Sequence, residues 1–191
     1  MENKKFQIVD WSKSDFNKNI ILKTHIIDNY DELKRKIKCR KDYVIAIGYN
    51  PSNKTIFNDD TTNLYLRDKI KKAYNDEIKG YILVNLIPKI QTKSQGIGQE
   101  FIDDKYINEI ITLINGFSTS QIVLFFGQNG VKLLNCGNDS LRKLKDLLNK
   151  NSKRIKYTSR PEEFIHPGRS VDNYVLRDWK SDLLEYKEGT A

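Results

Sequence analysis

The stretch Tyr43-Val-Ile-Ala-Ile47 decides the fold, because a continuous apolar run of this length is typical of a strand buried on both faces. Three similar runs follow along the chain, at 80–84, 121–126 and 154–158. Segments with apolar residues at helical spacing separate these runs. The alternation predicts an α/β domain with three α/β/α layers around a central, mainly parallel, four-stranded sheet.

Apolar residues at helical spacing, preceded by residues that cap helix N-termini, predict five helices. These helices are expected over about 29–38, 61–74, 104–116, 141–148 and 172–183. The segment 19–27 is expected to be a strand or an apolar entry segment, and the strand at 154–158 is expected to lie at an edge of the sheet. Glycine-containing stretches at 48–52, 89–99, 127–130 and 166–170 are expected to be loops.

A length of 191 residues fits one domain, with 1–42 as an N-terminal extension packed on it. The chain has no apolar run near 18 residues and no signal-peptide pattern, so we expect a cytoplasmic protein without a membrane partner. Cys39 and Cys136 are then expected to be reduced thiols. The net charge of +8 is compatible with a polyanionic partner, although abundant Lys and Asn also reflect AT-rich coding.

Polar residues follow the predicted strands at the ends where ligand sites form in parallel sheets. Asn50, Asn85, the 127–130 turn and His166 occupy these positions. Each has a structural alternative, since 48–52 can be a tight turn, Asn85 a strand cap and His166 part of a plain loop. Their joint placement at one edge of one sheet favours a binding or catalytic site.

Four segments, in this order, resemble motifs of the uracil-DNA glycosylase superfamily: Gly48-Tyr-Asn-Pro-Ser52, Tyr81–Leu86, Ile122–Gly127 and His166-Pro-Gly-Arg-Ser170. The first has the Gly-x-Asn-Pro form of the mismatch-specific branch. A closer resemblance, over about 43–180, is to a domain family of unknown function, number 1643. Its pattern stands here as Asn50–Ser52, Asp59–Thr61, Val84–Leu86, Phe126–Gly130 and His166–Pro167.

The glycosylase resemblance implies cleavage of the N-glycosidic bond of a flipped base, leaving an abasic site. It implies that Asn50 positions the attacking water and that His166 stabilises the negative charge that develops on the departing base. Asn85 would read the Watson–Crick edge, and its amide suits a uracil-like or a cytosine-like base according to its orientation. The remaining residues implied for the pocket are Gly48, Tyr49, Pro51, Ser52, Phe57 and Asp60.

Departures from the glycosylase pattern modify this expectation. Ser52 replaces a bulky Tyr, which predicts a roomier pocket for a non-canonical or modified pyrimidine. Ser170 stands where an apolar wedge is usual, and Arg169 is expected to contact a phosphate. Asp60 is either a helix N-cap or a second water activator. Phe57 and Tyr49 either stack on the base or pack in the core.

The resemblance implies no cofactor and no metal. The expected partner is single- or double-stranded DNA with a modified or mismatched base, bound by a monomer acting in repair or phage defence. Two alternatives remain open: a non-catalytic module that binds nucleic acid or modified bases, and a hydrolase of free nucleosides or nucleotides.

Overall fold

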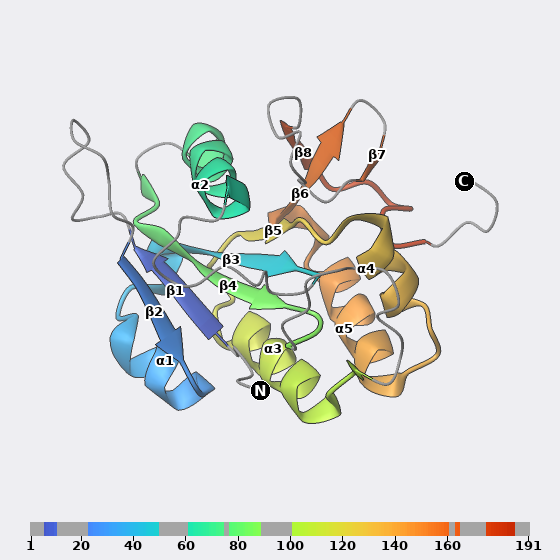
Figure 1. Cartoon of the computed structure of the whole chain (residues 1–191). Coiled ribbons are helices and arrows are strands. Elements are labelled where there is room, and N and C mark those ends of the chain that lie inside the picture. The colour runs from blue at the N-terminus through green and yellow to red at the C-terminus, as the bar shows by residue number, and fades with distance from the viewer. Residues whose placement is uncertain are drawn as a thin grey trace.

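The computed structural model of the chain describes residues 6–10, 23–49, 61–74, 77–88, 101–160, 163–164 and 175–185. These residues form a mixed sheet with helices on both of its faces (Figure 1). The α/β class predicted from the alternation of strands and helices is therefore confirmed.

Four parallel strands make the centre of the sheet, in the order β4-β3-β5-β6. Their bounds are β3 Tyr43–Gly48, β4 Gly80–Asn85, β5 Ile122–Leu124 and β6 Ile155–Arg160. All four correspond to the predicted runs. All six residues of β4 are buried, because helices cover both faces of the sheet there.

The sheet is larger than the four strands expected, so that prediction was wrong in size. Eight strands pair in all within the described residues. Two lie antiparallel beyond β4 and two pair antiparallel with β6: β1 Phe6–Asp10, β2 Lys23–Ile27, β7 Glu163–Phe164 and β8 Val175–Asp178. β2 lies within the segment 19–27, for which a strand was one of the two expectations. The other three are short and carry polar residues, so they lack the long apolar run that marks the central strands.

Two further predictions about the C-terminal part were wrong. The segment from Val175 to Asp178 is strand β8 and not the start of a helix. It pairs with Lys156–Ser159, so β6 is not an edge strand either. Pairing with the free side of β6 satisfies backbone groups of both segments, and this outweighs the helical spacing of the apolar residues near Val175.

The helices otherwise agree with the sequence prediction. Their bounds are α1 Tyr30–Lys36, α2 Thr61–Tyr74, α3 Asp104–Gly116 and α5 Asp139–Lys150, with short 3-10 turns η1 Arg40–Asp42 and η4 Ser152–Arg154. One helix was missed: residues 127–130, expected as a loop, are the first turn of α4, Gly127–Leu134. Gly127 has a φ of 61°, which favours glycine and lets the chain turn directly from β5 into this helix.

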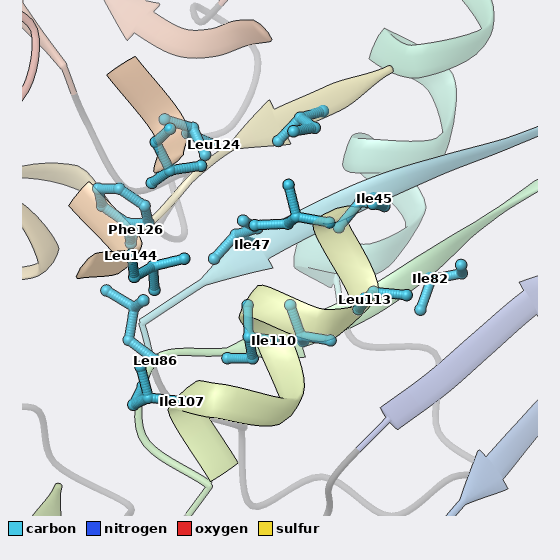
Figure 2. Close-up of a cluster of buried hydrophobic side chains, with 14 of the residues drawn as sticks. Ile45, Ile47, Ile82, Leu86, Ile107, Ile110, Leu113, Leu124, Phe126 and Leu144 are labelled. Atoms are coloured by element: carbon cyan, nitrogen blue, oxygen red, sulfur yellow. The ribbon is translucent and has the colours of Figure 1, made fainter. Parts of the chain in front are cut away.

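The core lies on both faces of the sheet. On one face, Ile45 and Ile47 of β3 pack with Ile107 and Ile110 of α3, together with Leu144 of α5 (Figure 2). The opposite face is covered by α2 through a second cluster, formed by Val44, Ala46, Leu66, Ile70, Tyr81, Leu83, Val123 and Phe125 with their neighbours. The sheet is thus held between two helical layers, and its strand ends form the edges of the molecule at which a site can be built.

The end of α3 is fixed by a half-buried arginine. The guanidinium of Arg154 donates hydrogen bonds to the backbone carbonyls of Ile114, Phe117 and Ser120, at 2.9, 2.7 and 2.7 Å. Burial lowers the pKa of Arg154 from its usual value, yet the group keeps its charge at neutral pH. Arg154, directly before β6, thus holds the connection between α3 and β5 in place.

Candidate functional site

The carboxyl ends of β3, β4 and β5 stand side by side. Gly48 at the end of β3 pairs with Asn85 at the end of β4. The pairing continues beyond both strands, because the N–H of Leu86 donates to the carbonyl of Gly48 at 2.9 Å. On the other side of β3, the N–H of Phe125 donates to the carbonyl of Ile47 at 2.9 Å. Asn85, Gly48 and Phe125 therefore form one row across the edge of the sheet.

The row presents its side chains on the face that α2 covers. Side chains alternate between the two faces along a strand. Val44 and Ala46 belong to the cluster on the α2 side, so Gly48 faces the same way. The same alternation places Asn85 on this face after Leu83, and Phe125 is itself a member of the cluster. An amide and an aromatic ring thus flank a position with no side chain.

Gly48 is required by how closely its neighbours approach. A Cβ atom at this position would meet Asn85 Oδ1 at 2.5 Å and the Phe125 ring at 2.6 Å (Cζ) and 2.8 Å (Cε2). Contacts under 3.0 Å are essentially never seen for a real Cβ. The amide oxygen and the ring edge consequently lie within about 5 Å of each other, above the glycine. The close packing of Asn85 and Phe125 therefore explains why the predicted motif has a glycine at position 48.

The Asn85 side chain is largely buried, and its amide makes no hydrogen bond to another described residue. Its exposed fraction is 8%. Buried polar groups are normally hydrogen-bonded, so this amide is a group that can bind a ligand. Its Oδ1 atom is the nearest atom to the position that a Cβ of Gly48 would occupy, and the edge of the Phe125 ring is the next nearest group.

The short strand β7 crosses the same edge of the sheet. Ser159 of β6 pairs with Phe164 of β7 and with Val175 of β8. Residues Lys156–Tyr157 pair with β5 on one side and β8 on the other, so β7 takes the β5 side of β6. Ser159 lies two residues past the last pair between β5 and β6. Phe164 therefore lies at the carboxyl edge, near the row of Asn85, Gly48 and Phe125.

Three of the predicted site residues are described. The structure brings Gly48 and Asn85 together. Tyr49 has an exposed fraction of 6% and belongs to the core on the α3 side of the sheet, and burial raises the pKa of its hydroxyl. Its hydroxyl therefore remains protonated at neutral pH. The other predicted site residues lie outside the described part of the chain: Asn50, Pro51, Ser52, Phe57, Asp60, His166, Arg169 and Ser170.

The described chain nevertheless leads into both catalytic candidates from this edge. Tyr49, directly before Asn50, is joined to the chain beyond β4, because its carbonyl accepts from the N–H of Ile87 at 2.9 Å. Phe164, two residues before His166, lies at the edge through its pairing with Ser159. The described residues that precede the two motifs therefore lie at the same end of the sheet.

Phe125 and Tyr106 are site residues that the sequence prediction missed. The ring of Phe125 was assigned to a buried strand, and only its register beside Gly48 reveals its position near the amide. Tyr106 lies in the first turn of α3, and its hydroxyl oxygen accepts a hydrogen bond from the backbone N–H of Asn85 at 3.3 Å. No sequence signal joins these residues, since each contact depends on the folded arrangement.

The described residues also bear on two other classes of function. Within these ranges, no group of three or more His, Cys, Asp and Glu side chains is arranged to hold a metal ion. No helix of the described part of the chain has the length and apolar character needed to cross a membrane.

Comparison with known proteins shows the family. The family described as a protein of unknown function (DUF1643) matches residues 32–167, and the chain belongs to it. This confirms the closer of the two resemblances. No curated protein and no solved structure matches the chain significantly. The resemblance to uracil-DNA glycosylases stays a prediction that rests on the four motifs.

Proposed function

We propose that this protein is a DNA base glycosylase of the uracil-DNA glycosylase-like class. It binds a flipped pyrimidine at the carboxyl edge of the sheet and cleaves its N-glycosidic bond, which leaves an abasic site. The observation that carries the proposal is the amide of the largely buried Asn85 side chain, which makes no hydrogen bond to another described residue and lies beside the Phe125 ring above Gly48. An amide and a flat apolar surface are the two groups that recognise the edge and the face of a base.

The orientation of Asn85 supports a base with a carbonyl group. Oδ1 lies beside the position above Gly48, and the proposal assigns the contact with the base to the Nδ2 group. Nδ2 only donates hydrogen bonds, so its partner must be an acceptor. Uracil, thymine and their 5-substituted forms have an O4 acceptor, whereas cytosine has an amino donor there, so the proposal places Nδ2 against position 4 of the base. The small Ser52 leaves the proposal open to 5-substituted members of this class.

The proposal assigns the chemistry to two motif residues, Asn50 and His166, on the basis of their resemblance to the glycosylase motifs. Asn50 orients the attacking water, since an amide can hold a water molecule but is a poor base. His166 donates a hydrogen bond to the departing base and so stabilises its negative charge. Stabilisation of the leaving group thus supplies most of the rate enhancement. The net charge of +8 supports a DNA substrate over a free nucleoside.

An assay with labelled oligonucleotides tests the proposal. The oligonucleotides carry uracil, thymine mismatches, 5-hydroxymethyl or glucosylated pyrimidines, or hypoxanthine, and alkaline treatment cleaves the strand at any abasic site formed. Cleavage should be lost in Asn50→Ala, His166→Ala and Asn85→Ala. It should persist in Asn108→Ala, which removes an exposed amide on α3. No cleavage of any oligonucleotide by the folded wild-type protein would overturn the proposal.

A binding module on the same fold is the second candidate. Ser170 in place of an apolar wedge and the neutral Asn50 favour it, because neither residue promotes duplex opening or deprotonates water. For this candidate we expect base-selective binding that depends on Asn85, with no abasic sites formed. A hydrolase of free nucleosides would instead show DNA binding with little dependence on salt concentration.

A further inference from the structure

The backbone N–H of Asn85 lies where the sheet ends. Along β4, successive N–H groups point alternately toward β3 and toward β1. The N–H of Leu86 donates to Gly48 in the direction of β3, so the N–H of Asn85 points toward β1. The pairing of β4 with β1 ends with Leu83 opposite Gln7, and Asn85 lies two residues beyond it. This N–H therefore needs an acceptor from elsewhere.

Tyr106 supplies this acceptor. Its hydroxyl oxygen lies 3.3 Å from the backbone nitrogen of Asn85. The ring stands next to Phe6 of β1, with the ring centroids 6.2 Å apart, so the tyrosine extends the pairing where the β1–β4 ladder stops. A side chain of helix α3 thereby accepts the backbone hydrogen bond that a neighbouring strand would otherwise accept from Asn85.

The tyrosine itself is held firmly. Its exposed fraction is 1%, and the side chain of Asp103, the N-cap of α3, accepts from its backbone N–H at 3.1 Å. Burial raises the pKa of the Tyr106 hydroxyl well above its usual value, so the group keeps its proton at neutral pH. A buried, capped and neutral side chain is a rigid support for the end of β4.

We infer that Tyr106 is a positioning residue for Asn85. It acts from the α3 side of the sheet on an amide that faces the α2 side, and it fixes the strand end on which that amide stands. This inference rests on the proposed function, because it concerns how Asn85 is aimed at a base. Small displacements of a recognition group weaken binding strongly, so a support outside the pocket can determine base selectivity.

Tyr106→Phe tests the inference, since it removes only the hydroxyl. The measurement is the ratio of affinities for a single-stranded oligonucleotide that contains 2′-fluoro-deoxyuridine, whose N-glycosidic bond resists cleavage, and for the same oligonucleotide with an abasic site. The substitution should lower this ratio about fivefold, as expected for one lost hydrogen bond. In the Asn85→Ala background it should change the ratio less than about twofold, because both residues act on the same contact.

Tyr43→Phe is the matched control. The Tyr43 hydroxyl donates to Asp10 at 3.3 Å near the opposite edge of the sheet. Tyr43→Phe therefore also removes one tyrosine hydroxyl and one hydrogen bond of 3.3 Å. This variant should leave the ratio unchanged. The inference would be overturned if Tyr106→Phe left the affinity ratio unchanged, or if it lowered the ratio equally in the wild-type and Asn85→Ala backgrounds. Either result would leave the glycosylase proposal standing. Equal affinity of the wild-type protein for the two oligonucleotides would instead contradict the proposed function.

A second measurement needs no ligand. The amide hydrogen of Asn85 should exchange faster with solvent in Tyr106→Phe than in the wild-type protein. The amide of Leu86, bonded to Gly48, should keep its rate in both. An Asn85 exchange rate that does not change would also overturn the inference, whatever base the protein binds.

Discussion

Replacing Gly48 by alanine tests the construction of the site directly. The added Cβ would lie 2.5 Å from Asn85 Oδ1 and 2.6 Å from the Phe125 ring, so at least one of these groups must move. Forcing an extra carbon into a packed site costs about 1–3 kcal/mol of the free energy of unfolding. For a chain of this size, each kcal/mol lowers the melting temperature by about 2–4 °C. The displaced amide and ring should also lose their base-selective binding.

Gly137→Ala is the matched control for this experiment. Gly137 has a φ of 90°, and no atom lies within 4 Å of the point that an added Cβ would occupy, so alanine is strained there without displacing a neighbour. The backbone strain costs a similar amount, about 1–3 kcal/mol. Urea unfolding should show comparable losses in the two variants, and affinity for the 2′-fluoro-deoxyuridine oligonucleotide should fall only in Gly48→Ala. A Gly48→Ala protein with the stability and affinity of wild type would refute the reasoning.

Three further variants test the fold. Arg154→Met should lower the free energy of unfolding by about 3 kcal/mol, measured in urea, because three backbone carbonyls after α3 lose a charged donor. Asn138→Ala should cost about 1 kcal/mol in the same assay, since its side chain accepts from Leu141 N–H at 2.9 Å as the cap of α5. The hydrogen bond from Lys79, followed by that from Cys39, lowers the pKa of Asp42 from its ordinary 3.8. Asp42 therefore adds stability above pH 3.8 that is lost as the pH falls through its lowered pKa. In Asp42→Asn, the melting temperature should fall less steeply with decreasing pH in this acid range.

The central strands could be predicted because burial on both faces leaves a plain signal. β3 and β4 are continuous apolar runs, so their strand character can be predicted from their own residues. Asp103 could be predicted as a cap from its type and position, and its side chain does accept from the Tyr106 N–H. By contrast, β1 carries Gln7 and Asp10 among its apolar residues, and its place beside β4 depends on pairing with residues far along the chain.

In the candidate site, too, some residues could be predicted from the sequence and others could not. Asn85 could be singled out because a polar residue at the end of an apolar strand stands at a known location for ligands. The role of Phe125 could not be predicted, because it depends on a register that puts its ring above Gly48. Tyr106 was invisible for a related reason, since α3 meets the end of β4 only in the folded chain. Asn50 and His166 remain predictions from their motifs.

The pairing of the outer strands determines the shortest fragment of this chain that we expect to fold without aggregating. The family match covers residues 32–167, whereas β1, β2 and β8 all lie outside it. A fragment cut to the matched residues would open one side of β4 and one side of β6, two strands that are otherwise flanked by neighbours. Open strand edges recruit other chains. Such a fragment should aggregate on expression, so the boundary suggested by sequence similarity is too narrow for laboratory work on this protein.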